Sequence, residues 1–170
     1  MLTDEELQQL HDRIAIQDVL VTYCRGIDRC DINVLKSAYW PDATDDHGSF
    51  VGNAHEFCDY VIPALKTMKM TMHSITNMHV ELDGNRAKAE TYCIAYHSLE
   101  GEDGPADMIV GGRYLDVLEK RMLKWKISER VYVMDWNQNQ PSTAEWEEGL
   151  FGQLKTRGAR FPDDPWYQFG

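Results

Sequence analysis

Residues 70–80, MTMHSITNMHV, separate into two alternating sets of side chains, as a β-strand does. Successive side chains of a strand point to opposite faces of the sheet, so His73, Asn77 and His79 are predicted to share one face. A neutral imidazole can accept a proton near neutral pH, which makes His73 a candidate general base. A lone histidine on a strand is more often a structural residue, so a catalytic role requires an acid within reach.

A candidate acid occurs in the segment YCRGIDRCD at residues 23–31. Asp28 follows an apolar stripe that ends at Ile27, so it is predicted at the edge of the buried face of a helix. A carboxylate on one ring nitrogen of His73 would fix the tautomer and stabilise the imidazolium that forms. The alternative is a helix-end or turn carboxylate with no catalytic partner.

An acid–base pair of this kind also needs a group that steadies negative charge on the substrate. Arg130 lies in the segment WKISERVYVMDW, and alternation groups it with Tyr132, Met134 and Trp136 on a mixed polar and aromatic face. A guanidinium there could hold a carbonyl, a carboxylate or a leaving oxygen. On spacing alone, a surface or ion-paired arginine is an equal alternative.

Several further side chains are candidates for binding a ligand, although the aromatic ones are core residues by default. The segment DDHG at residues 45–48 is either a turn or a polar rim where His47 contacts a ligand. His97 could lie on either face of its strand. The candidate substrate-binding residues are Tyr39, Trp40, His47, Phe50, Asn77, His97 and Trp136.

Composition excludes several classes of function. The 170 residues carry 28 acidic against 17 basic side chains, a net charge of −11, which disfavours nucleic acid or an anionic membrane as a partner. An apolar fraction of 43% is typical of a globular protein. No apolar run approaches the ~18 residues of a membrane span, and the start MLTDEELQQL lacks the pattern of a secretion signal. A cytoplasmic protein is predicted.

The spacing of histidines and cysteines argues against a metal site. His73 and His79 are six residues apart, ~20 Å along a strand, so they cannot bind one ion together. The sequence has no HxH, HExxH or CxxC motif and no glycine-rich phosphate loop. We therefore predict no metal and no cofactor. The four cysteines are interpreted as reduced and mostly buried thiols, namely Cys24, Cys30, Cys58 and Cys93.

Helices are predicted in the first half of the chain and strands in the second. Thr3 with Glu6 forms a capping box that opens a long helix, and Asp31 caps a shorter one that continues through Tyr39. Asn53 opens a third helix. A short strand is predicted within residues 42–52, a turn-rich segment at 100–107, and longer strands at 71–82, 86–99, 108–119 and 124–136.

This order indicates an α+β fold, in which a curved antiparallel or mixed sheet wraps around the N-terminal helices as an open cone. Residues 1–140 are predicted to form one domain. Residues 141–170 are predicted to form a tail with a short helix around Trp146 that packs on the domain or on a neighbouring subunit. Three helices can cover one side of a sheet, so we predict a homo-oligomer, a dimer or trimer, that covers the other.

Taken together, these motifs resemble a known family over about residues 5–137. The most specific features are the Tyr23-x4-Asp28 spacing, the DHG triplet, and the string of His73, Asn77 and Asp83-Gly84. The sequence resembles the SnoaL-like branch of the nuclear-transport-factor-2-like superfamily. Within it, the chain is most similar to a cluster that includes lindane dehydrochlorinase, bile acid 7α-dehydratase and scytalone dehydratase.

The resemblance implies a cone-shaped α+β barrel with a cofactor-free pocket, where an Asp–His dyad removes a proton and drives an elimination. It assigns the dyad to Asp28 and His73, an assisting tyrosine to Tyr23, and the pocket arginine to Arg130. His97 falls near the position of a second histidine in scytalone dehydratase. Some relatives are not catalytic, so the fold alone does not decide the activity.

The sequence thus predicts a dehydratase-like lyase without a cofactor that acts on a cyclic or lipophilic small molecule. In it, His73 is the base and Asp28 orients it, while Arg130 and Tyr23 steady the developing charge. An isomerase would share the same base. The alternatives from other classes are the small subunit of an aromatic-ring-hydroxylating dioxygenase and a small-ligand binding protein.

Overall fold

The first helix runs almost from the start of the chain to the candidate acid. The structure is a computed structural model that describes residues 1–101 and 104–170. Helix α1 (Asp4–Asp28) begins at the predicted capping box: the Thr3 hydroxyl accepts from the Glu6 amide at 3.2 Å, and the Glu6 carboxylate accepts from the Thr3 amide at 2.7 Å. The last residue of this helix is Asp28, which is buried.

Two shorter helices follow, each at a predicted cap. Helix α2 (Ile32–Ser37) is capped by the carboxylate of Asp31 and ends before Tyr39, which instead begins strand β1 (Tyr39–Asp46). The predicted continuation of this helix through Tyr39 is therefore wrong. After the short strand β2 (Val51–Asn53), helix α3 (Ala54–Thr67) is capped by the side-chain oxygen of Asn53.

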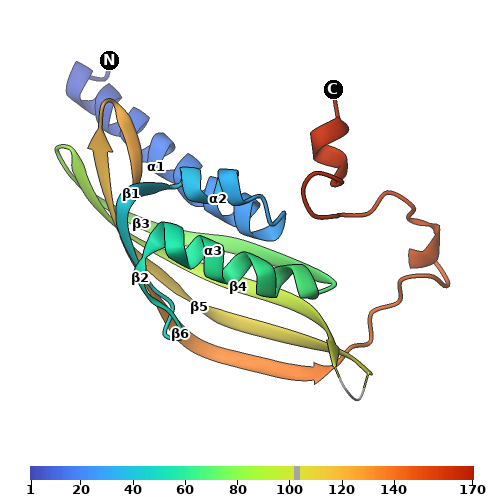
Figure 1. Cartoon of the computed structure of the whole chain (residues 1–170). Coiled ribbons are helices and arrows are strands. Elements are labelled where there is room, and N and C mark those ends of the chain that lie inside the picture. Colours follow the sequence, from blue (N-terminus) through green and yellow to red (C-terminus); the bar gives the residue numbers. More distant parts are fainter. Residues whose placement is uncertain (102–103) are drawn as a thin grey trace.

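The described residues form one mixed sheet with the strand order β2-β1-β6-β5-β4-β3 (Figure 1). β1 and β6 are parallel, and the other neighbours are antiparallel. The α+β class is therefore confirmed, with a curved sheet whose edge strands β2 and β3 do not pair, so that the barrel stays open. The long strands are β3 (Met70–Asp83), β4 (Arg86–Gly101), β5 (Gly104–Arg121) and β6 (Lys124–Pro141).

A β-bulge in β3 changes which side chains share a face. The register with β4 shifts between Ile75 and Met78, and an extra residue reverses the alternation beyond it. His73 and Ile75 therefore face the helices, whereas Asn77 and His79 are exposed. The prediction that Asn77 and His79 share a face with His73 is wrong, because the alternation of side chains does not continue across the bulge.

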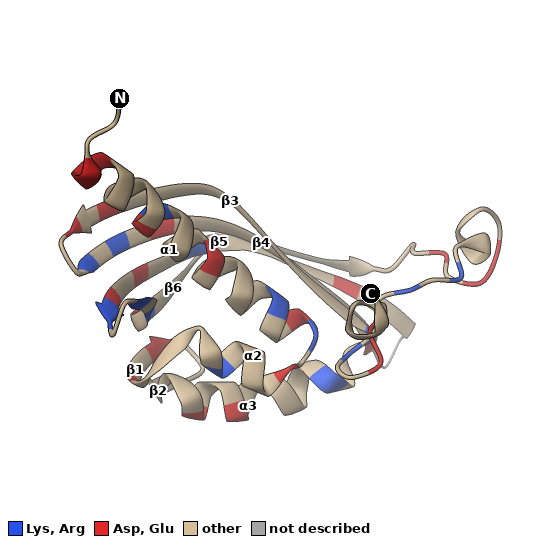
Figure 2. Ribbon diagram, turned by 90° about the horizontal axis from the view of Figure 1, so that it is seen from above, with Lys and Arg blue, Asp and Glu red and all other residues tan. Residues whose placement is uncertain are grey.

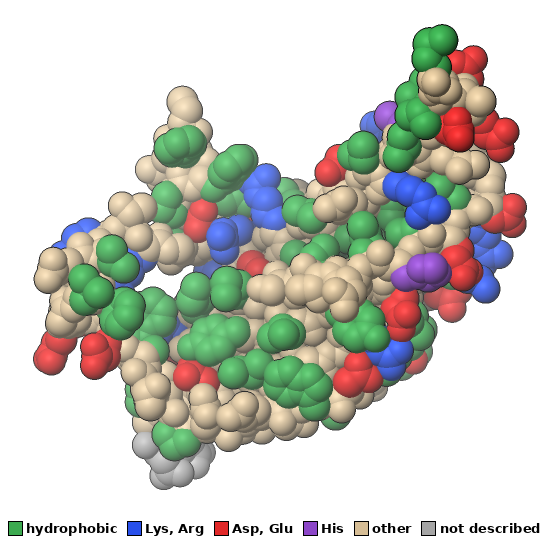
Figure 3. Space-filling view, turned by 180° about the vertical axis from the view of Figure 1, so that it is seen from behind, with side chains coloured by type: hydrophobic (Ala, Val, Ile, Leu, Met, Phe, Trp, Pro, Cys, Tyr) green, Lys and Arg blue, Asp and Glu red, His purple; other side chains and the backbone are tan. Residues whose placement is uncertain are grey.

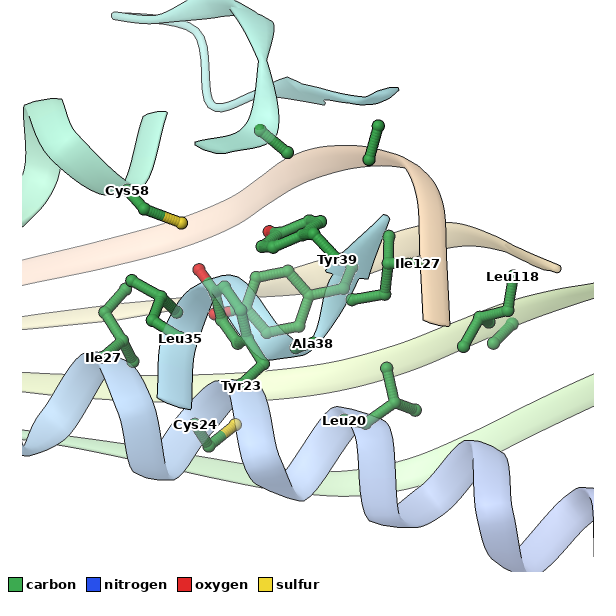
Figure 4. Packing of buried hydrophobic residues seen from close by; sticks show 14 of the residues in the cluster. Leu20, Tyr23, Cys24, Ile27, Leu35, Ala38, Tyr39, Cys58, Leu118 and Ile127 are labelled. Atoms are coloured by element: carbon green, nitrogen blue, oxygen red, sulfur yellow. The ribbon is translucent and has the colours of Figure 1, made fainter. Parts of the chain in front are cut away.

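All three helices lie on one side of the sheet, as the view from above shows (Figure 2). The core lies between these two layers, where Tyr23 and Leu20 of α1 pack near Tyr39 of β1 (Figure 4). The four cysteines are free and buried in this region. Within the described residues, no helix has the length and apolar character needed to cross a membrane.

The strands are longer than predicted at their far ends. Residues 100–101 and 104–107 of the predicted turn belong to β4 and β5, while residues 102–103 lie outside the described part of the chain. The residues around Trp146 form bends and turns, and the first short helix of the tail is the 3-10 helix Phe151–Gln153. A second 3-10 helix, Pro165–Gln168, follows where the tail returns toward α1 and α2 (Figure 1).

Candidate active site

The predicted acid and histidine meet between the end of α1 and strand β3. Asp28 Oδ1 lies 2.7 Å from His73 Nδ1, and Asp28 Oδ2 accepts from the main-chain N–H of His73 at 2.8 Å. The carboxylate therefore holds both the ring and the backbone of this residue. Because a carboxylate only accepts hydrogen bonds, Nδ1 carries the proton and Nε2 is left as the basic nitrogen.

His73 lines a cavity of about 470 Å³ between the helices and the sheet. Two further histidines, His47 and His97, also line the cavity, together with the phenol rings of Tyr23 and Tyr132. Most of the remaining wall is apolar or aromatic and comes from Ile27, Phe57, Tyr60, Val61, Leu65, Ala95, Met108, Val110 and Tyr114. A concave apolar site with few polar groups is typical of small-molecule binding.

Two buried polar atoms on this wall have no hydrogen-bond partner among the described residues. They are the hydroxyl of Tyr23 and Nδ1 of His97. Buried polar groups are nearly always hydrogen-bonded, so such atoms beside a cavity indicate positions where a ligand or water binds. The sequence did not decide which face of its strand His97 occupies. In the structure, His97 lies on the face that lines the cavity.

The ring of His97 lies edge-on to His73, with the two centroids 5.6 Å apart. Burial, together with the neighbouring imidazole of His73, lowers the pKa of His97 to about 4. His97 is therefore neutral at neutral pH. It can act as a hydrogen-bonding group toward a ligand, without adding a positive charge beside the candidate base.

Acid should destabilise the protein through His97. Its pKa is about 4 when folded and 6.5 in its ordinary state, so the unfolded chain binds this proton first and stability falls as pH drops below about 6.5. Between pH 7.5 and 5 the loss should be about 2 kcal/mol. Urea unfolding at both pH values should show a smaller loss in His97→Gln, and an unchanged one in the exposed control His79→Gln. An equal loss in all three proteins would contradict this assignment.

Arg130 lies one layer behind the cavity wall. Its guanidinium forms two hydrogen bonds of 2.7 Å with Asp116, and both side chains are fully buried. Its central carbon lies 4.0 Å from the ring centroids of both Tyr23 and Tyr114. Burial opposes its charge, but Asp116 more than offsets this and keeps the pKa of Arg130 well above its ordinary value. The predicted direct contact between Arg130 and a leaving group is not supported, because the tyrosines intervene.

The other predicted binding residues differ in their distance from the cavity. Tyr39 is buried beside it, with its hydroxyl on Asp45, and Phe50 packs against residues of the wall rather than lining it. Trp40 lies elsewhere, under Arg121 and Lys126.

Two predicted ligand contacts are wrong because strand bulges place the residues outside. Asn77 lies beyond the bulge in β3 and is exposed. Trp136 is 47% exposed and pairs with Gly111, where an added Cβ would lie 2.2 Å from its ring. Val110 lines the cavity, and successive residues of a strand face opposite sides. Gly111 and the indole of Trp136 that packs against it therefore lie on the outer face of the sheet.

The tail supplies a positioning residue that the sequence did not reveal. The guanidinium of Arg160 donates to the main-chain carbonyl of Asp28, to the hydroxyl of Thr71 at 2.8 Å, and to the carbonyl of Leu65 at 3.0 Å. It thereby connects the ends of α1 and α3 with strand β3. Arg160 is 132 residues from Asp28 along the chain, so no local pattern could have predicted this contact.

A curved sheet under three helices, with a histidine-lined cavity between them, defines a nuclear-transport-factor-2-like α+β protein. Residues 8–131 match the family model described as SnoaL-like domain, so the chain belongs to this family. The family resemblance noted in the sequence is confirmed. The C-terminal tail lies outside the matched region.

Similar proteins share the fold more clearly than a function. An uncharacterized protein of Mycobacterium tuberculosis is 26% identical over 72% of this chain and 85% of its own length. Hexachlorocyclohexane dehydrochlorinase LinA-type3 from Novosphingobium barchaimii has a TM-score of 0.72 at 20% identity, covering 82% of this chain and 97% of its own. A candidate scytalone dehydratase from Novosphingobium aromaticivorans has a TM-score of 0.70 at 19% identity, over 80% and 92%.

Proposed function

We propose that this protein is a cofactor-independent lyase that eliminates a small group, such as water, from a cyclic or otherwise lipophilic molecule. The observation that supports this most is the carboxylate-backed imidazole of His73 on the wall of an apolar cavity of about 470 Å³. Solved structures with this fold include a dehydrochlorinase and a candidate dehydratase. Both names describe eliminations, in which a base takes a proton from carbon.

In the proposed reaction, Nε2 of His73 removes a proton from carbon, and the imidazolium that forms is stabilised by Asp28. The free hydroxyl of Tyr23 donates to an oxygen of the substrate as negative charge develops there. Burial raises the pKa of Tyr23 well above its ordinary value, so the phenol stays protonated and remains a donor. Arg130 contributes through its position beneath this ring, not by touching the substrate.

The shape of the cavity supports a substrate larger than a simple acid. Its aromatic and aliphatic wall offers few polar partners, so one ring carrying a carbonyl or hydroxyl group fits the lining. An isomerase that returns the proton to another carbon would use the same base. A screen of cyclic β-hydroxy ketones and enones therefore has two readouts, loss of water and migration of the double bond.

The test of the proposed function is this screen, followed by absorbance and mass spectrometry. We expect wild-type protein to eliminate water from at least one cyclic hydroxy ketone, and dialysis against a chelator to leave the rate unchanged. If elimination requires an added metal, the acid–base mechanism is incorrect. If saturable binding occurs with no turnover and does not depend on His73, the protein is a ligand carrier. Co-purification with a larger iron–sulfur subunit would instead favour the dioxygenase subunit.

We also propose that the protein forms a homo-oligomer through the outer face of the sheet. Hydrophobic side chains gather on the face seen from behind (Figure 3). The large exposed apolar residues on this face of the strands are Met72, Tyr92, Ile94, Leu115 and Trp136. Apolar groups grouped in this way mark an interaction surface.

We expect light scattering at micromolar concentration to give the mass of a dimer or trimer. Ile94→Arg places a charge in this surface and should shift the protein toward the monomer. The matched control is Met122→Arg, in the hairpin between β5 and β6, where the side chain is 87% exposed. A monomeric wild-type protein would contradict the proposal.

A further inference from the structure

The cavity contains a second carboxylate-backed histidine, which the reaction above does not use. Asp45 Oδ1 contacts Nδ1 of His47, and Asp45 Oδ2 accepts from the hydroxyl of Tyr39 at 2.7 Å. The ring of His47 is stacked between Phe57 and Tyr132, with centroid distances of 4.4 Å and 5.4 Å. This imidazole is thus held in one orientation on the cavity wall, with Nε2 as its remaining nitrogen.

The charge of Asp45 indicates the protonation state of His47. The Asp45 side chain is fully buried, and a buried carboxylate requires a cationic partner or several donors. Among the described residues, His47 is the only one with a basic side chain in contact with Asp45, while Tyr39 is a neutral donor. Arg130 in the adjacent strand is already neutralised by Asp116. A cationic His47 would balance the charge of Asp45.

The first pair is arranged differently, although its residue types are the same. The carboxylate of Asp28 accepts one neutral donor, the main-chain N–H of His73 at 2.8 Å, as Asp45 accepts the hydroxyl of Tyr39. Asp28 also has a second cation nearby, because the guanidinium of Arg160 donates to its main-chain carbonyl. That positive charge offsets part of the charge of the Asp28 carboxylate. The two pairs therefore differ in how the charge of the carboxylate is balanced. Arg160 lies beside Asp28, whereas among the described residues only His47 places a basic side chain on Asp45.

We propose that His47 is the general acid of this cavity, and that the substrate is a β-hydroxy carbonyl compound. This inference rests on the proposed function and specifies its substrate class. His73 takes the proton on the carbon beside the carbonyl, and that electron pair forms the carbon–carbon double bond. The bond from the β-carbon to oxygen breaks, and the oxygen takes the proton of His47 Nε2 and leaves as water. One proton is gained by His73 and one is lost by His47, and both exchange with solvent afterwards.

The other titratable groups that face His47 do not compete for this role. Tyr132 of β6 and Tyr114 of β5 both lie near the ring. Burial raises the pKa of Tyr132 to about 12 and that of Tyr114 well above its ordinary value, so both are neutral phenols at neutral pH. Phe57 of α3 covers the opposite face of the ring without any charge.

The charge of His47 is measurable without a substrate. In protein labelled with ¹⁵N-histidine at pH 7, His47→Gln identifies the signals of His47 by their loss. We expect both ring nitrogens of His47 to be protonated, those of His73 to show one bare nitrogen, and Asp45→Asn to remove the second proton from His47. Asp46→Asn, at the half-buried neighbouring carboxylate, is the matched control. A bare Nε2 on His47 in the wild-type protein would overturn the proposal.

The catalytic role is tested with two ketones that differ only in the leaving group, a β-hydroxycyclohexanone and its β-(nitrophenoxy) counterpart. Hydroxide needs an acid to leave, whereas nitrophenoxide does not. His47→Gln should slow loss of water on the order of 10²-fold and loss of nitrophenoxide only a few-fold, while His73→Ala slows both. Equal losses with both ketones in His47→Gln would overturn the general-acid role. Failure of the wild-type protein on both ketones would instead overturn the proposed function, and the nitrogen spectra would still decide the charge of His47.

Discussion

Replacing His73 by alanine should lower turnover by about 10²–10⁴-fold and leave ligand binding largely intact. The imidazole supplies the basic nitrogen. Among the described residues that line the cavity, no other side chain forms a hydrogen bond with the carboxylate of Asp28. Asp28→Asn should also be severe, because an amide can hold the wrong tautomer and cannot stabilise the imidazolium. The double variant should be little worse than the worse single one, since the two side chains act as one unit.

The measurement is the rate of elimination by each variant on the best ketone found in the screen, with binding followed separately by fluorescence or calorimetry. His79→Ala is the matched control, because His79 lies on the same strand but is exposed. Circular dichroism must first show that each variant is folded. A folded His73→Ala protein that retains turnover within a few-fold of the parent would show that another group is the base.

The second large effect concerns stability. Asp116→Asn should reduce the free energy of unfolding by about 3–5 kcal/mol, because it leaves the charge of Arg130 buried without a counterion. Both side chains of this pair are fully buried, and the pair joins β5 to β6 directly beneath Tyr23 and Tyr114. The loss is large against the total stability of a domain of this size, about 5–15 kcal/mol. Urea unfolding monitored by tryptophan fluorescence measures it.

The chain provides a matched control for burial. Arg113 and Asp135 also form two hydrogen bonds, both of 3.0 Å, across the same two strands, but on the exposed side of the sheet. Asp135→Asn should therefore shift the unfolding midpoint far less. Replacing both Arg130 and Asp116 by apolar residues should recover much of the stability lost in the single variant. Similar losses in the buried and exposed single variants would contradict this account.

The sequence predicted the elements well where the signals were local. The capping residues Thr3, Asp31 and Asn53 each begin a helix, and the Asp83-Gly84 turn joins two paired strands. Asp28 and His73 also proved to be partners, since the apolar stripe of α1 and the alternation of early β3 together place them on facing surfaces.

The features that the sequence missed depend on contacts between distant residues or on irregular strands. The bulge at residues 76–77 has no signature in the alternation, so Asn77 was predicted on the wrong face. Arg130 was predicted on the correct side of its strand, but its pairing with Asp116 requires the register of β5 and β6. The spacing of Asp45 and His47, two residues apart where strand β1 ends, did contain a signal for a second pair.

Removal of a proton from carbon by His73 can be measured directly as hydrogen–deuterium exchange into a cyclic ketone without a leaving group. In deuterated buffer, proton abstraction beside the carbonyl is followed by return of a deuteron, which proton NMR of the ketone detects. We expect wild-type protein to accelerate this exchange, and folded His73→Gln to lower the acceleration by about 10²-fold or more. Exchange that persists within a few-fold in folded His73→Gln would contradict proton removal by His73.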